Sequence, residues 1–211
     1  MAPLEESDGS EEEYWDKMSH LYDAFVEREH SGLYTRVRKL CFKYVKRKQN
    51  ILDVATGTGD LALTLAKRSK NITGIDISGK MISVADSRTK ENPKFLLGDT
   101  HDLEFKRGEF DMVTCCNGLH VFRDPAGALS EMRRVLSVGG ILVTVTFAYG
   151  DADLGQRMHL WGQFLKLGMP PYWHSFEGPQ LRRMHYKAGF KILKAIYCWS
   201  DPPTVLIVAR K

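Results

Sequence analysis

The chain has 211 residues, of which 43% are hydrophobic and 27% are charged, and its formal net charge at pH 7 is +4. This composition is that of an ordinary soluble globular protein, and the length suffices for one domain with a sizeable core. Basic and acidic residues alternate along most of the chain, and the one dense basic run is 43–48. Because nucleic-acid binding calls for a wider basic face, we expect no nucleic-acid partner.

Membrane and secretion signals are absent from the pattern of residues. No stretch reaches the roughly 18 apolar residues that a membrane span needs, and the acidic start has no apolar signal core. The four cysteines lack C-x-x-C spacing, so we expect no metal site. These features predict a cytoplasmic protein without stable membrane insertion.

The N-terminal region divides into an acidic end and a helical part. Residues 1–13 are acidic and aperiodic, which predicts disorder, and residues 14–211 are expected to form a single domain. Helical spacing starts at Tyr14, and a second helix is predicted over 33–47. Residues 14–48 would therefore form two helices ahead of the first strand.

From residue 50 onward, predicted strands and helices alternate. Strands are expected at 50–55, 71–77, 94–99, 109–118, 141–148, 190–200 and 204–211, and helices at 60–68, 79–88 and from Pro125 to Gly139–Gly140. Apolar strands alternating with helices predict a parallel sheet covered on both faces. The short link before the last strand permits only an antiparallel pair. The predicted fold is α/β and Rossmann-like, with a seven-stranded, mostly parallel sheet and a C-terminal antiparallel hairpin.

A glycine-rich turn follows the first predicted strand. Gly57 and Gly59 can take positive φ and leave room for a ligand, which in open α/β sheets binds at the carboxyl ends of the strands. Asp76, at the end of the second strand, would lie beside this turn, where a carboxylate can accept both hydroxyls of a ribose. Asp99 ends the third strand and could meet an adenine amino group. The three strand ends would then describe one adenosine-bearing ligand.

Two ligand classes fit such a turn. Residues 57–62 satisfy the G-x-G-x-x-G/A pattern of dinucleotide-binding proteins, so an NAD-dependent oxidoreductase is one hypothesis. Asp53 argues against it, because a carboxylate there would face a negatively charged pyrophosphate. A ligand with a cationic amino-acid end would be attracted to Asp53 instead. S-adenosylmethionine has that end, together with a sulfonium and an adenosine.

Four segments in this order carry a family resemblance: ILDVATGTGDLA (51–62), GIDIS (74–78), GDTHDLEF (98–105) and GLHVFRDPAGALSEMRRVLSVGGILV (118–143). They resemble the class I S-adenosylmethionine-dependent methyltransferases, above all the ubiquinone/menaquinone biosynthesis C-methyltransferase group and related small-molecule methyltransferases. The resemblance covers about residues 14 to 148. It implies S-adenosylmethionine as cofactor, S-adenosylhomocysteine as product and a small-molecule methyl acceptor.

Carried over position by position, the resemblance implies a set of cofactor-binding residues. Those around the methionine part would be Asp53, Ala55, Gly57 and Thr58, with Gly59 completing the turn. Those around the adenosine would be Asp76, Ile77, Asp99, Thr100 and His101. Asn117 and Leu119 would lie near the sulfonium, and Tyr22 would belong to an N-terminal helix that closes over the cofactor.

His120 is the candidate catalytic residue. It follows the fourth strand, at the end of the sheet where the cofactor would lie, and histidine titrates near neutral pH. A positioned general base typically adds about 10²–10⁴-fold to a rate. The quinone C-methyltransferase group usually has arginine at this position, so oxygen, nitrogen, sulfur and carbon acceptors all stay open.

Residues 149–189 are the predicted acceptor lid. Aromatic side chains such as Trp161, Phe164 and Trp173 suit the wall of a pocket for a hydrophobic or planar acceptor, and equally a helix packed on the sheet. Gly162 and residues 168–171 interrupt the helical pattern, which favours a mobile cover.

Other functions stay open at this stage. The main alternative is a non-catalytic S-adenosylmethionine-binding protein that acts through a partner. RNA methylation is less favoured, because the Asn/Asp-Pro-Pro-aromatic signature is replaced here by CCNGLH (115–120). The sequence leaves the oligomeric state open.

Overall fold

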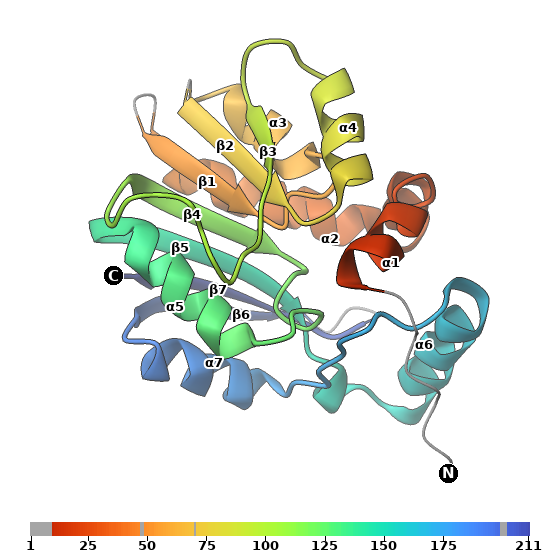
Figure 1. Ribbon diagram of the computed structural model, residues 1–211. Coiled ribbons are helices and arrows are strands. Elements are labelled where there is room, and N and C mark those ends of the chain that lie inside the picture. The colour runs from red at the N-terminus through yellow and green to blue at the C-terminus, as the bar shows by residue number, and fades with distance from the viewer. Residues whose placement is uncertain (1–9, 47–48, 70, 199–201) are drawn as a thin grey trace.

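The computed structural model describes residues 10–46, 49–69, 71–198 and 202–211. Its centre is a seven-stranded sheet in the order β3-β2-β1-β4-β5-β7-β6 (Figure 1). The strands are β1 (Asn50–Val54), β2 (Asn71–Asp76), β3 (Lys94–Leu97), β4 (Phe110–Cys116), β5 (Leu136–Phe147), β6 (Lys191–Cys198) and β7 (Thr204–Arg210). The first five strands pair in parallel, and β7 runs antiparallel to both β5 and β6. The predicted fold is confirmed.

Helices cover both faces of the sheet. They are α1 (Glu11–Met18), α2 (Tyr22–Tyr44), α3 (Asp60–Ala66), α4 (Gly79–Ser87), α5 (Pro125–Val135), α6 (Leu154–Leu167) and α7 (Gly178–Lys187), with a 3-10 turn at Tyr149–Asp151. One apolar core joins α2, α3 and α4 to one face, and a second joins α5 and α7 to the other. Helices α1 and α6 lie at the same end of the sheet (Figure 1). Within the described part of the chain, no helix combines the length and apolar character needed to cross a membrane.

The start of the chain differs from the prediction. Residues 11–13 were expected to be disordered but form the first turn of α1, because Ser10 Oγ accepts the Glu13 N–H and acidic side chains favour a helix N-terminus. Residues 1–9 lie outside the described residues. The predicted helix 33–47 is the C-terminal half of α2, which runs without a break from Tyr22.

Two glycine assignments were also wrong. Helix α5 ends at Val135, not at Gly139–Gly140, because the chain already pairs with β4 from Leu136 onward. Gly139 has φ +77° and lies inside β5, where the register against β4 shifts. Gly162 does not interrupt α6, whereas Gly168, with φ +80°, ends it as expected.

His185 is a fully buried polar group that joins α7 to the sheet. Its Nδ1 donates to the Leu181 carbonyl (2.8 Å), so Nε2 of the neutral ring accepts from Thr144 Oγ1 (2.9 Å). Burial lowers the pKa of His185 to about 4, although the bond to Leu181 opposes the shift. As pH falls, the unfolded chain binds a proton near pH 6.5 before the folded chain does. His185 therefore contributes a loss of stability between about pH 6.5 and pH 4.

We predict that His185→Gln makes the free energy of unfolding less dependent on pH between 6.5 and 4.5, because the titrating group is gone. At pH 7 the variant should be about 1–3 kcal/mol less stable, since buried hydrogen-bond geometry is disturbed. Urea unfolding at several pH values measures both effects. His159→Gln, at an exposed histidine of α6, is the matched control. An unaltered pH slope in His185→Gln would contradict the assignment.

Candidate active site

Two neighbouring cavities open at the carboxyl ends of the parallel strands. The first we name the polar cavity because carboxylates and backbone turns border it. The second we name the aromatic cavity, since rings from α1, α2, β5, α6 and the stretch after α6 border it. The two share four wall residues, which are Trp15, Tyr22, Asn117 and Val121.

The structure brings most of the predicted cofactor-binding residues together. Those bordering the polar cavity are Tyr22, Ala55, Gly57, Asp76, Ile77, Asp99, Thr100, His101 and Asn117. Asp53, Thr58, Gly59 and Leu119 do not border it. The sequence analysis did not predict that Glu11 and Trp15 of α1 border the cavity. For Glu11 the available signal was the acidic cluster after Ser10, which favours a helix start. For Trp15 it was an apolar position early in that helix.

Asp76 ties the glycine turn to the end of β2. Its Oδ2 accepts the Gly57 N–H (2.8 Å) and its Oδ1 accepts the Ser78 N–H (3.0 Å). Burial raises the pKa of Asp76, and the backbone N–H donors oppose that shift. Ala55 and Gly57 both have positive φ, at +52° and +55°. A non-glycine residue in this region is uncommon and concentrates at functional sites.

Gly59 is needed for packing. Its φ is +82°, and a Cβ there would lie 2.6 Å from the Phe95 ring, so no larger residue fits. Thr58 instead faces the N-terminal helices, where its Oγ1 donates to Asp23 Oδ1 (2.6 Å). Leu119 is fully buried in the apolar core behind the cavity wall.

Asp53 differs from the expectation. Its carboxylate is buried beneath the turn and accepts hydrogen bonds from Thr56 Oγ1 (2.7 Å) and Thr114 Oγ1 (2.5 Å). Burial raises the pKa of Asp53 to about 6, and the two hydroxyls oppose the shift. The Asp53 side chain borders neither cavity. It supports the turn from below through Thr56. The predicted direct contact with the cationic end of a ligand is not part of this arrangement.

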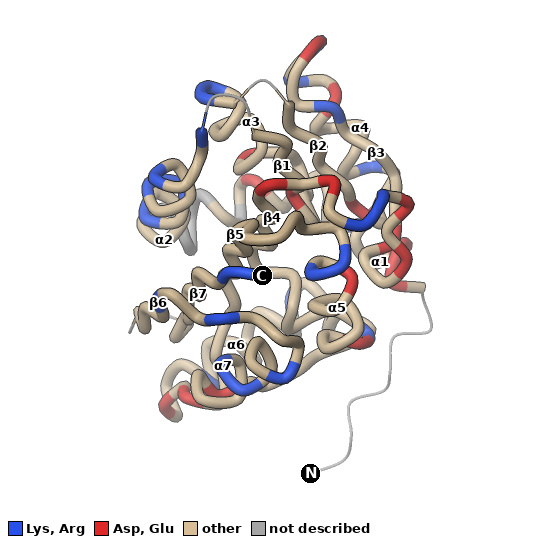
Figure 2. The backbone as a smooth tube through the Cα atoms, turned by 90° about the vertical axis from the view of Figure 1, so that its left-hand side faces the viewer, with Lys and Arg blue, Asp and Glu red and all other residues tan. Residues whose placement is uncertain are grey.

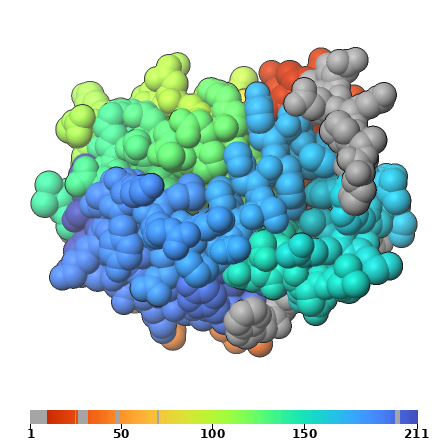
Figure 3. Space-filling model, turned by 90° about the horizontal axis from the view of Figure 1, so that it is seen from below, coloured from red at the N-terminus to blue at the C-terminus, as the bar shows by residue number. Residues whose placement is uncertain are grey.

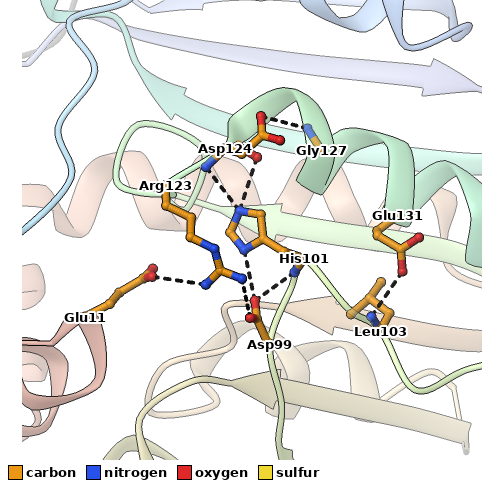
Figure 4. A network of polar contacts seen from close by, with 8 residues as sticks. All are labelled: Glu11, Asp99, His101, Leu103, Arg123, Asp124, Gly127 and Glu131. Carbon is orange, nitrogen blue, oxygen red and sulfur yellow. Dashed lines mark hydrogen bonds and ion pairs between the residues drawn. The ribbon is translucent and has the colours of Figure 1, made fainter.

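Glu11, Asp99 and His101 line the polar cavity and belong to a network of charged residues (Figure 4). Asp99 Oδ2 accepts from Arg123 (2.5 Å), and its Oδ1 accepts from the N–H and Nδ1 of His101 (2.8 and 2.9 Å). Partial burial raises the pKa of Asp99, but these donors outweigh it and hold the pKa below its usual value. Arg123 also lies 3.9 Å from Glu11 of α1. The Asp99 carboxylate is thus already engaged by a cation.

Carboxylates attach the N-terminal helices to the cavity rim at further points. Asp16 of α1 accepts from Ser78 Oγ (2.6 Å) and from the Lys80 N–H (3.1 Å). Asp23 of α2 accepts from Thr58 and forms an ion pair with Arg88. Figure 2 shows the acidic residues of α1 grouped on that helix. These contacts hold α1 over the polar cavity.

A hydroxyl pair stands where the two cavities meet. Tyr22 Oη and Tyr34 Oη are 3.2 Å apart, and Asn117 Nδ2 donates to Tyr34 Oη (2.9 Å). Burial raises the pKa of both tyrosines, so both stay protonated at physiological pH. Asn117 follows β4 with φ +57°, a second strained non-glycine residue at the strand ends.

His120 borders the aromatic cavity. Its ring lies 5.0 Å from Phe147 and 5.2 Å from Trp173, centroid to centroid. Burial, with a smaller contribution from His174, lowers the pKa of His120 to about 3. Its Nδ1 is buried and has no hydrogen-bond partner among the described residues. The imidazole is therefore neutral at physiological pH and presents a polar atom within an apolar wall.

Residues 149–189 form much of that wall. The inner side of α6 contributes Leu160, Phe164 and Leu167, and Trp173 follows the helix. Phe164 packs edge-on against Trp173, with ring centroids 4.9 Å apart. Figure 3 shows α6, α7 and the stretch between them spread over the lower face of the molecule.

Comparison with known proteins assigns the family. The Methyltransferase domain family matches residues 52–144. A demethylmenaquinone methyltransferase of Thermotoga maritima is 36% identical over 61% of this chain and 58% of its own length. A ubiquinone/menaquinone biosynthesis C-methyltransferase of Geotalea daltonii is 36% identical over 70% of this chain and 67% of its own length. The chain belongs to the class I S-adenosylmethionine-dependent methyltransferases.

Solved structures agree with the fold of this methyltransferase. An S-adenosylmethionine-dependent methyltransferase of Methanosarcina mazei superposes with a TM-score of 0.70 at 22% identity, over 82% of this chain and 96% of its own. The predicted family and cofactor are confirmed. The match to the Thermotoga relative spans little more than half of that protein.

The polar cavity fits S-adenosylmethionine. At Gly57 a Cβ would meet only the Tyr22 ring, at 3.7 Å, so the turn lets a ligand approach the backbone closely. Asp76 supplies a carboxylate for ribose hydroxyls, and Ile77 and Met81 supply apolar surface for a flat base. The buried Asn117 Oδ1 has no partner in the described ranges and suits a cationic group.

We predict that Asp76→Asn weakens S-adenosylhomocysteine binding about tenfold or more, because a charged acceptor of hydroxyl and N–H donors is lost. Isothermal titration calorimetry measures the dissociation constant, and thermal unfolding checks the fold. Asp102→Asn, an exposed carboxylate after β3 that borders neither cavity, is the matched control. Equal affinity in both variants would remove Asp76 from the site.

Proposed function

We propose that this chain transfers the methyl group of S-adenosylmethionine to a small, planar and largely apolar acceptor that binds in the aromatic cavity. The observation that carries the proposal is the shared wall of Trp15, Tyr22, Asn117 and Val121 between a polar cavity and an aromatic one. Aromatic walls with a few convergent polar atoms are typical of sites for flat organic molecules. The names of the two relatives refer to demethylmenaquinone and to ubiquinone/menaquinone biosynthesis, and a quinone ring is planar.

When bound, S-adenosylmethionine supplies a methyl group on a positively charged sulfur. An electron pair of the acceptor would form the new bond to carbon, the carbon–sulfur electrons would stay on sulfur, and the proton lost by the acceptor would pass to solvent. The protein contributes position, because holding both partners in near-attack geometry is worth about 7–11 kcal/mol. In this proposal the polar cavity orients the donor and Trp173, Phe164 and Phe147 orient the acceptor. Helices α1 and α2 exclude water by closing over both.

His120 is the proposed contact for a proton on the acceptor. Since burial lowers the pKa of His120 to about 3, the ring is a neutral hydrogen-bond acceptor and a weak base at physiological pH. It therefore suits orienting an acceptor O–H or N–H more than removing its proton outright.

The free Cys41, Cys115, Cys116 and Cys198 favour a reducing, cytoplasmic location. The proposal includes neither nucleic acid nor stable membrane insertion.

Activity is tested by release of S-adenosylhomocysteine from S-adenosylmethionine with a panel of phenols, quinols, amines and thiols. We predict that Trp173→Ala raises KM for the best acceptor about tenfold or more, because aromatic contact area is lost, and leaves S-adenosylhomocysteine affinity within about twofold. Trp161→Ala, on the outer face of α6, is the matched control. No turnover with any acceptor class, or binding of NAD in place of S-adenosylhomocysteine, would refute the proposed function.

We further predict that wild-type kcat/KM shows no inflection near pH 6.5 that depends on His120, because the buried ring stays neutral down to about pH 3. His120→Gln should lower kcat/KM about tenfold at every pH from 5 to 8, since an oriented hydrogen bond is lost. The pH–rate profiles of both proteins provide the measurement. An inflection near pH 6.5 that disappears in His120→Gln would show a normally titrating base.

A further inference from the structure

Tyr34 is a buried hydroxyl that the sequence motifs do not explain. It lies on α2, borders the aromatic cavity and is 8% exposed. Its Oη contacts Asn117 Nδ2 at 2.9 Å and Tyr22 Oη at 3.2 Å. It therefore connects the residue after β4 to the tyrosine that faces both cavities.

The hydrogen bond between Tyr22 Oη and Tyr34 Oη can run in either direction, and the hydrogen bond that Tyr34 accepts from Asn117 is compatible with Tyr34 as its donor. The Asn117 amide N–H donates to Tyr34 Oη, so the single phenol proton of Tyr34 is available for Tyr22 Oη. The proton of Tyr22 is then left for a ligand. At the other end, Asn117 Oδ1 is buried and unpartnered among the residues that the structure describes.

The backbone holds the side chain of Asn117 in place but not the orientation of its amide. Its N–H donates to the Val145 carbonyl (2.8 Å), and its φ of +57° is kept by the turn. Rotation of the amide by half a turn would exchange its N–H₂ and its carbonyl oxygen. When the Tyr34 O–H donates to Tyr22, the Tyr34 oxygen can interact favourably only with the N–H₂ of these two groups.

We propose that Tyr34 is a positioning residue that keeps the Asn117 carbonyl oxygen, and not its N–H₂ group, directed at the junction of the two cavities. This inference rests on the proposed function, in which the positive sulfonium and its methyl group lie at that junction. A carbonyl oxygen attracts a positive group, whereas an amide N–H₂ repels it. Tyr34 thereby selects for a cation at the junction without touching the cofactor itself.

Sinefungin tests this without any methyl acceptor. It is an S-adenosylmethionine analogue with an ammonium-bearing carbon in place of the methylated sulfur, whereas S-adenosylhomocysteine is uncharged at that point. We expect the wild type to bind sinefungin about tenfold or more tightly than S-adenosylhomocysteine, since charge-assisted hydrogen bonds are strong. In Tyr34→Phe this preference should fall about three- to tenfold, with S-adenosylhomocysteine affinity changed less than about twofold.

Two further variants separate orientation from folding. Tyr44→Phe is the same substitution on the same helix, away from both cavities, and should leave both affinities unchanged. Asn117→Gly tolerates positive φ and removes the amide, so it should lower the preference as well. Tyr34→Phe should have no added effect on the preference in the Asn117→Gly background, because both act through the same oxygen.

Isothermal titration calorimetry gives the two dissociation constants, and the thermal unfolding midpoint of each variant without ligand checks the fold. An unchanged sinefungin preference in a folded Tyr34→Phe protein overturns this inference and leaves the proposed function intact. An additional loss of preference in the double variant also overturns it, because Tyr34 would then act by another route. A wild type that binds neither nucleoside overturns the proposed function and this inference together.

Discussion

One carboxylate, that of Asp76, joins two strand ends by accepting the N–H groups of Gly57 and Ser78. The turn between β1 and α3 can hold its positive φ values because Asp76 fixes it from the side and Asp53 braces it from below through Thr56. Both carboxylates are buried, and burial raises both pKa values. Removing these two groups from water therefore costs free energy when the chain folds. Hydrogen bonds from Thr56 and Gly57 of the turn, and from Ser78 and Thr114 outside it, offset these costs.

The two cavities differ in what their walls offer a ligand. The polar cavity presents backbone turns and carboxylates that suit hydroxyls and positive charge, whereas the aromatic cavity presents rings and the neutral His120. Asn117 and Tyr22 belong to both walls. In the proposed function a methyl group crosses this boundary, and two chemically distinct halves would hold each partner on its own side.

Alternating apolar strands and helices were enough to predict the seven-stranded sheet, and strand ends were enough to place Asp76 and Asp99 beside the glycine turn. Asn117 was placed there only by the family resemblance. The role of Asp53 was not accessible, because Thr114, which occupies its carboxylate, lies 61 residues away in the sequence. Tyr34 resembles any packing aromatic of a helix until its neighbours are known. Glu11 was assigned to a disordered end, since the Arg123 that it approaches belongs to a distant loop.

Helices α1 and α2 carry Trp15 and Tyr22, which stand in the walls of both cavities. Carboxylates of these helices accept hydrogen bonds from hydroxyls and backbone N–H groups at the cavity rim, and Asp23 pairs with Arg88. The exposed ion pair weakens as salt is added. Because the Trp15 and Tyr22 side chains are shared, α1 and α2 cover both chambers as one unit. One pair of helices thus screens the polar and the aromatic side of the site from solvent together.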